Sequence, residues 1–337
     1  MKPTPHMRRY HSLSRLRRLA VTLGAALCTL VGQPTAAQTA ASFPSRPIYI
    51  VVPTPAGGPS DTAARQVAQG LSAAWGQQVI VENKPGASGA VAAQAVMNAK
   101  NDGYTLLWAQ GAMAGLPLVQ KSTPYRNLNE LAPVTNAVQF GFAIFANKEQ
   151  PFKTFAELVK YGKANPGKLN FATGTLGEFM FATHVLDAVG VRAERVPYKG
   201  GAQLMPDLIG GQVQINFGPI VSGMSHVKAG KLAMLATLQA TRNPQFPDVP
   251  TTAELGIPTD NMPTWNAIFA PSGTPRDVID KIATASAKVL KTPAVKNSLE
   301  QQGAEALGTT PQQLALAVED ATATWKAFVR KHNIPQE

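Results

Sequence analysis

The stretch Ile48–Arg65, which reads IYIVVPTPAGGPSDTAAR, decides the fold class of this chain. Its first five residues are apolar or aromatic and mostly β-branched, and they predict a buried strand that ends at Pro53. Gly57 and Gly58 then permit a tight turn, and apolar residues that recur every three or four positions predict a helix over 61–75. A strand, a short turn and a helix in this order begin a βαβ unit.

The same alternation of short apolar runs and amphipathic segments continues to the end of the chain. Further strands are predicted at 79–82, 104–109, 169–172, 194–198, 213–217, 232–238 and 265–270. Further helices are predicted at 90–98, 155–164, 178–189, 202–209, 222–229, 277–290, 294–302 and 311–329. This alternation favours an α/β fold with a largely parallel sheet.

Residues 1–37 have the pattern of a secretory signal peptide. Six cations and no acid precede the apolar run Leu19–Val31, which is too short to cross a bilayer as a helix. Small residues before Gln38 predict cleavage after Ala37, with cleavage before Ser42 as the second choice. We therefore expect a periplasmic protein. The arginine pair at 17–18 leaves open whether it is exported by the Sec route or by the twin-arginine route.

Charge and cysteine content exclude several classes of function for the mature chain. Six of the 31 cations leave with the signal peptide, and the remaining 25 face 20 acids without forming a basic stripe, so we expect no nucleic-acid partner. Cys28 is the only cysteine and lies in the signal peptide, which excludes disulfides and thiol chemistry later. Leu27 stands where a lipobox needs a small residue, so we expect no lipid anchor.

About 300 mature residues exceed one comfortable core and predict two domains. Two apolar stretches, Val138–Ala146 and Leu232–Ala240, are long enough to pass between them. We expect domain 1 to comprise 43–142 and 241–337, and domain 2 to comprise 143–240. Two crossings of this kind make a hinged pair of domains with a ligand cleft between them.

Three loops rich in small residues follow predicted strands, at 53–58, 171–178 and 85–89. A helix N-terminus offers unpaired N–H groups and a positive dipole end, so such a loop can hold a carboxylate. The same glycines equally suit a purely structural turn, and both interpretations stay open. Loops at the carboxyl ends of strands can converge on one cleft.

Five motifs in order resemble the Bug receptors, the binding proteins of tripartite tricarboxylate transporters. They are Pro55–Gly58 (PAGG) with Asp61 and Arg65, Val81–Gly89 (VENKPGASG), Val196–Gly201 (VPYKGG), Gly210–Val213 (GGQV) and Ala270–Pro275 (APSGTP). The resemblance spans essentially residues 43–330. It implies a two-domain periplasmic binding fold of type II (Venus flytrap), with hinge crossovers and with loops that grip a carboxylate.

On this basis we expect a monomeric receptor that takes a small organic acid, or a related carboxylate or amide, to transporter membrane subunits. The ligand-binding residues that we expect are Thr54, Pro55, Ala56, Gly57, Gly58, Asp61, Ser88, Gln110, Thr173, Thr175, Leu176, Gly177, Glu178, Tyr198, Lys199 and Gly218. The mature chain has three histidines and no clustered metal ligands or triad pattern, so we expect no cofactor and no enzyme activity. The alternative is a ligand-free or sensory adaptor with the same fold.

The sequence departs from the Bug pattern at three expected pocket positions. Glu178 stands where Ser or Thr is common, Phe181 where His is common, and Gly218 where Asp is often found. Glu178 near a helix start can be a simple capping residue, favoured by the helix dipole. Alternatively, it repels a second carboxylate, and the ligand then has an amide, ammonium or other donor at that end.

Overall fold

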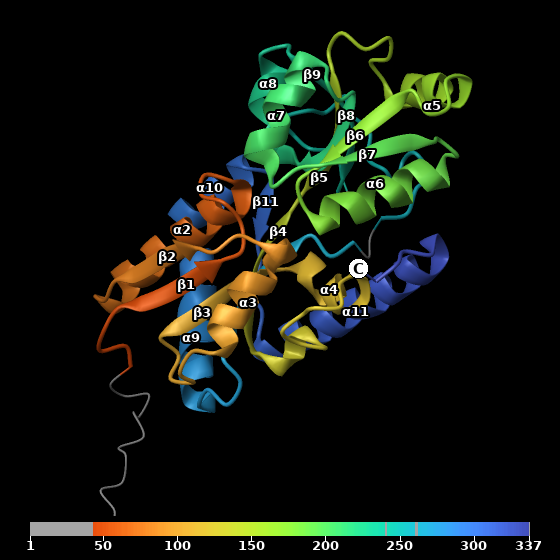
Figure 1. The fold of residues 1–337 in the computed structure, drawn as a ribbon. Helices are drawn as coiled ribbons and strands as arrows, with labels where there is room; N and C mark the ends of the chain where they lie inside the picture. Colours follow the sequence, from red (N-terminus) through yellow and green to blue (C-terminus); the bar gives the residue numbers. More distant parts are fainter. Residues whose placement is uncertain (1–42, 240, 260–261, 337) are drawn as a thin grey trace, which may run out of the picture. The chain divides into compact units, whose positions relative to one another are not determined.

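The computed structural model describes residues 43–239, 241–259 and 262–336 (Figure 1). Strands and helices alternate along most of them, as predicted, and form two sheets. The strands at 132–140, 142–147 and 304–306 were not predicted, and the first two follow each other without a helix between them. The expected signal peptide, its cleavage sites and Cys28 lie outside the described residues. In the part of the chain that the structure describes, no helix is long and apolar enough to cross a membrane.

The first sheet has six strands in the order β11-β4-β10-β3-β1-β2. These are β1 (Ile48–Val52), β2 (Val79–Asn83), β3 (Thr105–Gln110), β4 (Ala132–Phe140), β10 (Trp265–Ala270) and β11 (Ala304–Ala306). The helices in the same parts of the chain are α2 (Pro59–Trp75), α3 (Ala90–Met97), α4 (Leu116–Val119), α9 (Arg276–Leu290), α10 (Pro293–Gln301) and α11 (Pro311–His332). Three 3₁₀ turns accompany them: η2 (Ala87–Gly89), η3 (Gly111–Gly115) and η4 (Leu128–Glu130).

The second sheet has five strands in the order β7-β6-β8-β5-β9. These are β5 (Phe142–Asn147), β6 (Leu169–Thr173), β7 (Ala193–Pro197), β8 (Ile215–Pro219) and β9 (Leu232–Leu238). The helices between them are α5 (Phe155–Ala164), α6 (Leu176–Ala188), α7 (Gly201–Gly210) and α8 (Ile220–Lys228).

Both sheets are mixed, which corrects the expectation of a largely parallel sheet. Strand β1 runs parallel to β2 and β3, and β6 runs parallel to β7 and β8, as βαβ units require. Strand β10 is antiparallel to β3 and β4, and β5 is antiparallel to β8 and β9. Strand β11 is likewise antiparallel to β4. Strands β5 and β10 are each the first strand after the chain arrives from the other sheet, and no helix crossover within the sheet sets their direction.

The chain passes from the first sheet to the second at Gly141, between β4 and β5. It returns through residues 239–264, after β9 and before β10. The β4 strand begins at Ala132, six residues before the apolar stretch from which the crossing was inferred. The domain boundaries at 142/143 and 240/241 stay a prediction.

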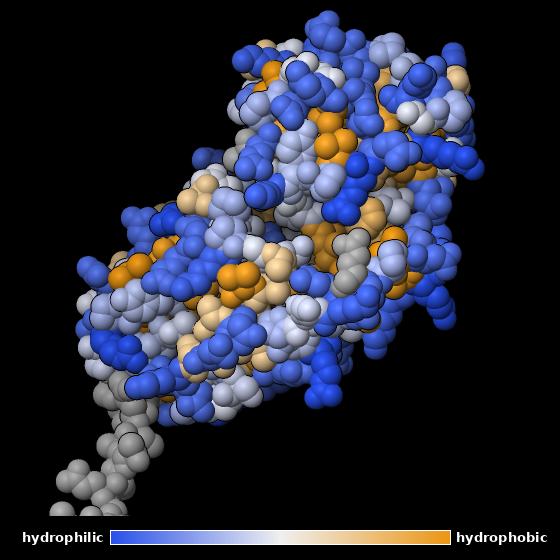
Figure 2. Space-filling model, in the orientation of Figure 1, coloured by the Kyte–Doolittle hydropathy of each residue, from blue (hydrophilic) through white to orange (hydrophobic). Residues whose placement is uncertain are grey.

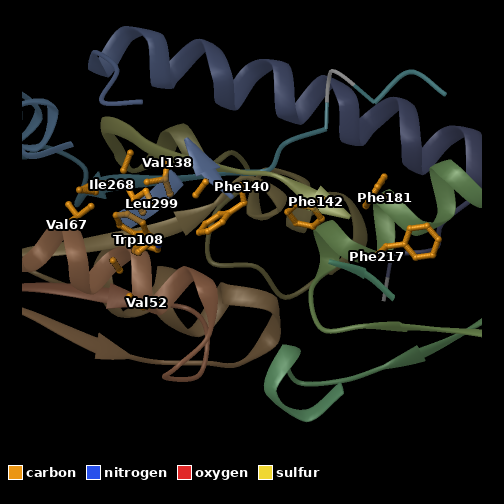
Figure 3. Packing of buried hydrophobic residues seen from close by; sticks show 14 of the residues in the cluster. Val52, Val67, Trp108, Val138, Phe140, Phe142, Phe181, Phe217, Ile268 and Leu299 are labelled. Atoms are coloured by element: carbon orange, nitrogen blue, oxygen red, sulfur yellow. The ribbon is translucent and has the colours of Figure 1, made fainter. Parts of the chain in front are cut away.

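The hydrophobic core continues through this crossing (Figure 3). Phe140 and Phe142, at the end of β4 and the start of β5, belong to one buried cluster with side chains of both sheets. The Phe142 ring lies 6.0 Å from that of Phe181 on α6, and Phe181 lies 5.5 Å from Phe217 on β8. These edge-to-face contacts anchor the start of α6 close to the crossing.

A second connection runs through the end of α11. Its Phe328 packs edge-on against Phe179 of α6 at 6.0 Å, and Lys331 Nζ lies 2.7 Å from the Asp187 carboxylate. Apolar side chains gather in this region, between α6 and the α4–α11 region (Figure 2). Helix α6 therefore contacts elements of both sheets at both of its ends.

Candidate functional site

The β1–α2 loop, residues 53–58, is shaped by one buried carboxylate in the first turn of α2. Asp61 is 2 % exposed, and its Oδ2 accepts hydrogen bonds from Gly57 N at 2.9 Å and Arg65 Nε at 3.0 Å. Asn83 Nδ2 donates to Asp61 Oδ1 at 2.8 Å and to the Thr54 carbonyl at 3.0 Å. Both carboxylate oxygens are engaged inside the loop, so Asp61 fixes the loop rather than facing a ligand.

The electrostatics of Asp61 agree with this structural role. Burial alone would raise the pKa of its carboxyl group. Hydrogen bonds from Arg65, Gly57 and Asn83, together with the charge of Arg65, outweigh burial and hold the pKa below its usual value. Asp61 is therefore ionised at neutral pH, and the loop keeps its shape.

The two glycines of this loop differ in conformation. Gly57 has a φ of +83°, which a β-branched side chain adopts only under strain, although nothing lies within 4 Å of the place of its Cβ. Gly58 is extended, with φ −79° and ψ 168°, and is the N-cap of α2 without a side-chain cap. Gly57 thus serves the turn itself, whereas Gly58 leaves the helix N-terminus open.

The β6–α6 loop carries a helix cap built from Thr175 and Glu178. Thr175 Oγ1 accepts a hydrogen bond from Glu178 N at 3.2 Å, and Gly174 N donates to Glu178 Oε2 at 2.5 Å. Glu178 is only 4 % exposed. Its carboxyl group is directed at its own loop, as the capping interpretation of this residue expects.

Burial dominates the charge state of Glu178. It raises the pKa of Glu178 to about 7, although hydrogen bonds from Gly174, Asn216 and Thr175 act in the opposite direction. A buried carboxylate needs a cation or several donors to stay ionised. Here the donors only partly offset the loss of water.

Loops of the two sheets meet at this end of the strands. Gly174 lies against the backbone of Gly200, so that a Cβ on Gly174 would come within 2.8 Å of the Gly200 carbonyl carbon. Gly200 in turn lies beside the Pro55 ring, and Gly177 lies beside Ala112 of η3. The loops after β1, β3, β6 and β7 therefore contact one another. Of the three loops that were expected to converge, 53–58 and 171–178 take part in these contacts.

Five expected site residues lie at the margin of this meeting point or outside it. Ser88 is exposed in the turn before α3, and Lys199 is exposed beside Gly200. Tyr198 donates its hydroxyl to Asp207 Oδ2 at 2.7 Å, so its polar tip is engaged within its own sheet. Gln110 is half-buried at the end of β3, and Gly218 is buried in β8.

Asn216 was missed by the sequence analysis and belongs at this site. It is 1 % exposed, its Nδ2 donates to the Ala172 carbonyl at 3.0 Å, and its Oδ1 has no partner among the described residues. A Cβ on Gly218 would stand 2.8 Å from that oxygen, so glycine at 218 makes room for the amide. A lone polar residue two positions before Gly218 in an apolar strand was the available signal.

Arg195 was also missed. Its Nε donates to Thr173 Oγ1 at 3.0 Å, and its guanidinium lies 4.2 Å above the Phe179 ring. It therefore brings a positive charge close to the β6–α6 loop. Thr173 is itself 1 % exposed, so it accepts this bond in the interior rather than at the surface.

The expectation that Phe181 lies in the pocket is wrong. Phe181 is 1 % exposed and packs in the core against Phe142 and Phe217 (Figure 3). Its position five residues into α6 turns the ring toward the sheet. Trp108 is likewise fully buried, with its Nε1 donating to Ser60 Oγ at 3.2 Å.

No group of three or more His, Cys, Asp and Glu side chains that could hold a metal ion occurs among residues 43–239, 241–259 and 262–336. Two surface hollows of about 400 and 470 Å³ flank α9, both bordered by Asp280, Thr284 and Lys288. Neither is lined by a residue of the converging loops. The loops are packed against one another instead.

Comparison with known proteins places this geometry in a family. The family described as tripartite tricarboxylate transporter family receptor matches residues 63–334. The chain is 32 % identical to BugT of Bordetella pertussis over 325 residues, which is 94 % of this chain and 98 % of BugT. It is 33 % identical to the UPF0065 protein in the gbd 5′ region of Cupriavidus necator over 329 residues, 96 % of this chain and 98 % of the relative.

Solved structures of related proteins align with most of this chain. The periplasmic binding protein BugD aligns with a TM-score of 0.80 at 30 % identity, over 88 % of this chain and all of BugD. Rpa4515 of R. palustris, solved with adipate, aligns at 0.83 and 29 % identity over 88 % of this chain and all of that protein. MatC of Rhodopseudomonas palustris, solved with malate, aligns at 0.77 and 28 % identity over 85 % of this chain and all of MatC.

Proposed function

Because this chain belongs to the tripartite tricarboxylate transporter receptor family, we propose that it captures a small organic acid, or a related carboxylate or amide, in the periplasm. It then delivers this ligand to the membrane subunits of a tripartite transporter. The observation that carries the proposal is the convergence of loops 54–58, 173–178 and 198–200 at the carboxyl ends of their strands. The carboxylates bound by Rpa4515 and MatC support the choice of ligand class.

The open N-terminus of α2 is the proposed carboxylate site. Gly58, its N-cap, supplies no side-chain acceptor, and Pro59 at the first helical position has no N–H, so the N–H groups of Ser60 and Asp61 and the positive dipole end of the helix are what can face an anion. Thr54 Oγ1 is buried in the same loop without a partner among the described residues, and its hydroxyl can donate to a carboxylate oxygen. Asp61 holds the loop in place from behind.

The unpartnered Oδ1 of Asn216 refines the ligand class. A buried acceptor without a donor is unfavourable, and either a ligand N–H or O–H group or the O–H of a neutral Glu178, whose carboxyl group the Asn216 side chain reaches, would satisfy it. We therefore expect a carboxylate that also bears a hydroxyl, ammonium or amide group. Malate and succinate, which differ by one hydroxyl, make a matched pair of probes.

A thermal-shift screen of the mature protein against mono-, di- and tricarboxylates, amides and amino acids tests the proposal. A ligand at a hundred times its Kd adds about 2.7 kcal/mol of stability, and malate should shift the melting temperature more than succinate. A shift with no carboxylate, amide or amino acid would contradict the proposal and favour the adaptor alternative. Equal melting-temperature shifts with malate and succinate would contradict only the proposed role of Asn216, and not the binding of a carboxylate.

Gly58→Val is the variant that separates binding from folding. The extended backbone at Gly58 accepts a β-branched residue, and only the Pro55 carbonyl lies near, 3.8 Å from the place of its Cβ. We expect at least a tenfold loss of affinity with little change in apo stability, because the side chain screens the helix N-terminus. Gly57→Val should instead destabilise the apo protein, because Gly57 has a positive φ.

The proposed mechanism includes closure of the two predicted domains about Gly141 and the 239–264 return. The loops of both sheets contact one another in this structure, so it corresponds to the closed arrangement, which a ligand would favour over an open one. Small-angle scattering with saturating ligand should then give a smaller radius of gyration. An unchanged radius at saturation would contradict closure.

A further inference from the structure

Glu178 is a buried acid in the first turn of α6, at the end of the proposed ligand loop. Its carboxyl group accepts from Gly174 N, and the Asn216 side chain also reaches it as a hydrogen-bond partner. Gly174 lies against Gly200, which lies beside Pro55 of the carboxylate loop. A charge on Glu178 would therefore act on any ligand held between these loops, with little water to screen it.

No cation compensates Glu178 among the described residues. The elements packed against the first half of α6 are β6, β8 and η3, which have no titratable side chain, and the end of α11, whose Phe328 packs on Phe179 and whose last turn has Arg330, Lys331 and His332. Arg195 of β7 is the nearest cation that the loop contacts, and it bonds Thr173 and stacks on Phe179. The other ionisable groups on or against α6, including His184, Asp187 and Lys331, lie in its second half.

Two physical effects oppose each other at this carboxyl group. The N–H groups of Gly174 and Asn216 and the dipole of α6 favour the ionised form. Burial without a counter-ion favours the neutral form, and it is the larger influence. A neutral carboxyl group still accepts the Gly174 N–H through its carbonyl oxygen.

We propose that Glu178 is a positioning residue: its buried carboxyl group holds the Gly174 N–H, and a carboxylate ligand binds between these loops while this group is neutral and presents no negative charge to it. This rests on the proposed function. It differs from the idea that Glu178 itself attracts a ligand ammonium group. A receptor for an anion can thus contain a glutamate at its ligand loop.

The proposal makes ligand binding depend on pH. A carboxylate ligand binds better when Glu178 is neutral, so its affinity falls as pH rises through the titration of Glu178, by up to about tenfold per pH unit. A ligand that pairs an ammonium group with ionised Glu178 would show the opposite trend. The sign of the slope therefore separates the two roles.

Carbon-13 NMR of the side-chain carboxyl groups of the apo protein tests the charge state without any ligand. Glu178 and Glu157 are assigned from Glu178→Gln and Glu157→Gln, with Glu157 as the exposed control. We expect Glu178 to titrate near neutral pH, well above Glu157, whose pKa is lowered. Titration of Glu178 at or below the usual range of a glutamate would overturn the proposal.

Calorimetric titration of adipate and malate from pH 6 to 9 tests the effect on the ligand. We expect affinity to fall with pH in the wild-type protein and in Glu157→Gln, and this slope to vanish in Glu178→Gln. The same slope in Glu178→Gln, or a rising affinity in the wild type, would overturn the positioning role. If no carboxylate binds at any pH, the proposed function fails, and the apo NMR titration still decides the protonation of Glu178.

Discussion

Two helices of the second sheet begin with the same Thr-x-x-Glu pattern and differ in the charge of the glutamate. At α5, Thr154 Oγ1 accepts from Glu157 N at 3.2 Å, and Glu157 accepts from Lys153 N and Thr154 N at 2.7 and 3.1 Å. At α6, Thr175 Oγ1 accepts from Glu178 N at the same 3.2 Å. The two caps are alike in sequence and in hydroxyl geometry.

Their surroundings set them apart. Glu157 is exposed, and backbone hydrogen bonds from Lys153 and Thr154 lower the pKa of its carboxyl group. Glu178 is buried, and burial raises its pKa to about 7. The capping motif thus determines which backbone groups are hydrogen-bonded, whereas the burial of the glutamate determines whether its carboxyl group is charged.

The largest difference should appear in the pH dependence of stability. The pKa of Glu178 is raised above its unfolded value of 4.5, so its contribution is fully present below pH 4.5 and is lost as pH rises through about 7. Relative to Glu178→Gln, the wild-type protein should lose up to roughly 3 kcal/mol of unfolding free energy over this window. Urea denaturation at a series of pH values measures it.

Glu157→Gln provides the control for that experiment. The pKa of Glu157 is lowered, so its contribution is present above its unfolded pKa and is lost as pH falls. The two glutamates should therefore give slopes of opposite sign. Parallel stability curves for the wild type and Glu178→Gln would mean that Glu178 is ionised throughout.

Replacing each of the two glutamates by alanine should change the free energy of unfolding by an intermediate amount. Glu178→Ala leaves the part-buried Gly174 N–H without its acceptor, which costs about 1–3 kcal/mol. Glu157→Ala should cost less, because water can replace the carboxylate at Lys153 N and Thr154 N. Unfolding free energies at pH 5, where Glu178 is neutral, compare them. Equal losses would contradict the role given to burial.

The threonines should differ least. Thr154→Ala and Thr175→Ala each remove one hydroxyl acceptor at 3.2 Å and should each cost about 1 kcal/mol. Nearly equal losses of unfolding free energy in the two threonine variants would show that the two caps differ only through their glutamates. A much larger loss at Thr175 would show that the β6–α6 loop depends on its hydroxyl rather than on Glu178.

The sequence was informative where periodicity and turn chemistry decide structure. The strand at Ile48–Val52, the glycine turn and α2 follow from patterns within a few residues of each other, and the family motifs follow the same order along the chain. Antiparallel β5 and β10 were not predictable in this way. Their direction depends on how the chain enters each sheet, which no local pattern encodes.

The candidate site shows the same limit. Asp61 and Tyr198 were expected at the ligand but bond to their own loop or helix, because a motif marks a position without giving the direction of its side chain. Asn216 was missed because its importance rests on an unpartnered oxygen beside Gly218. The protonation of Glu178 depends on burial, which appears only once the loops are assembled.

The central claim is that a carboxylate ligand lies between the β1–α2 and β6–α6 loops. Nitrogen-15 NMR of the mature protein during titration with the best carboxylate of the screen tests it most directly. We predict the largest amide shifts at Ala56, Gly57 and Gly58, followed by Gly174 and Thr175. Largest shifts along α9, beside Thr284 and Lys288, with these loops unchanged, would contradict the account.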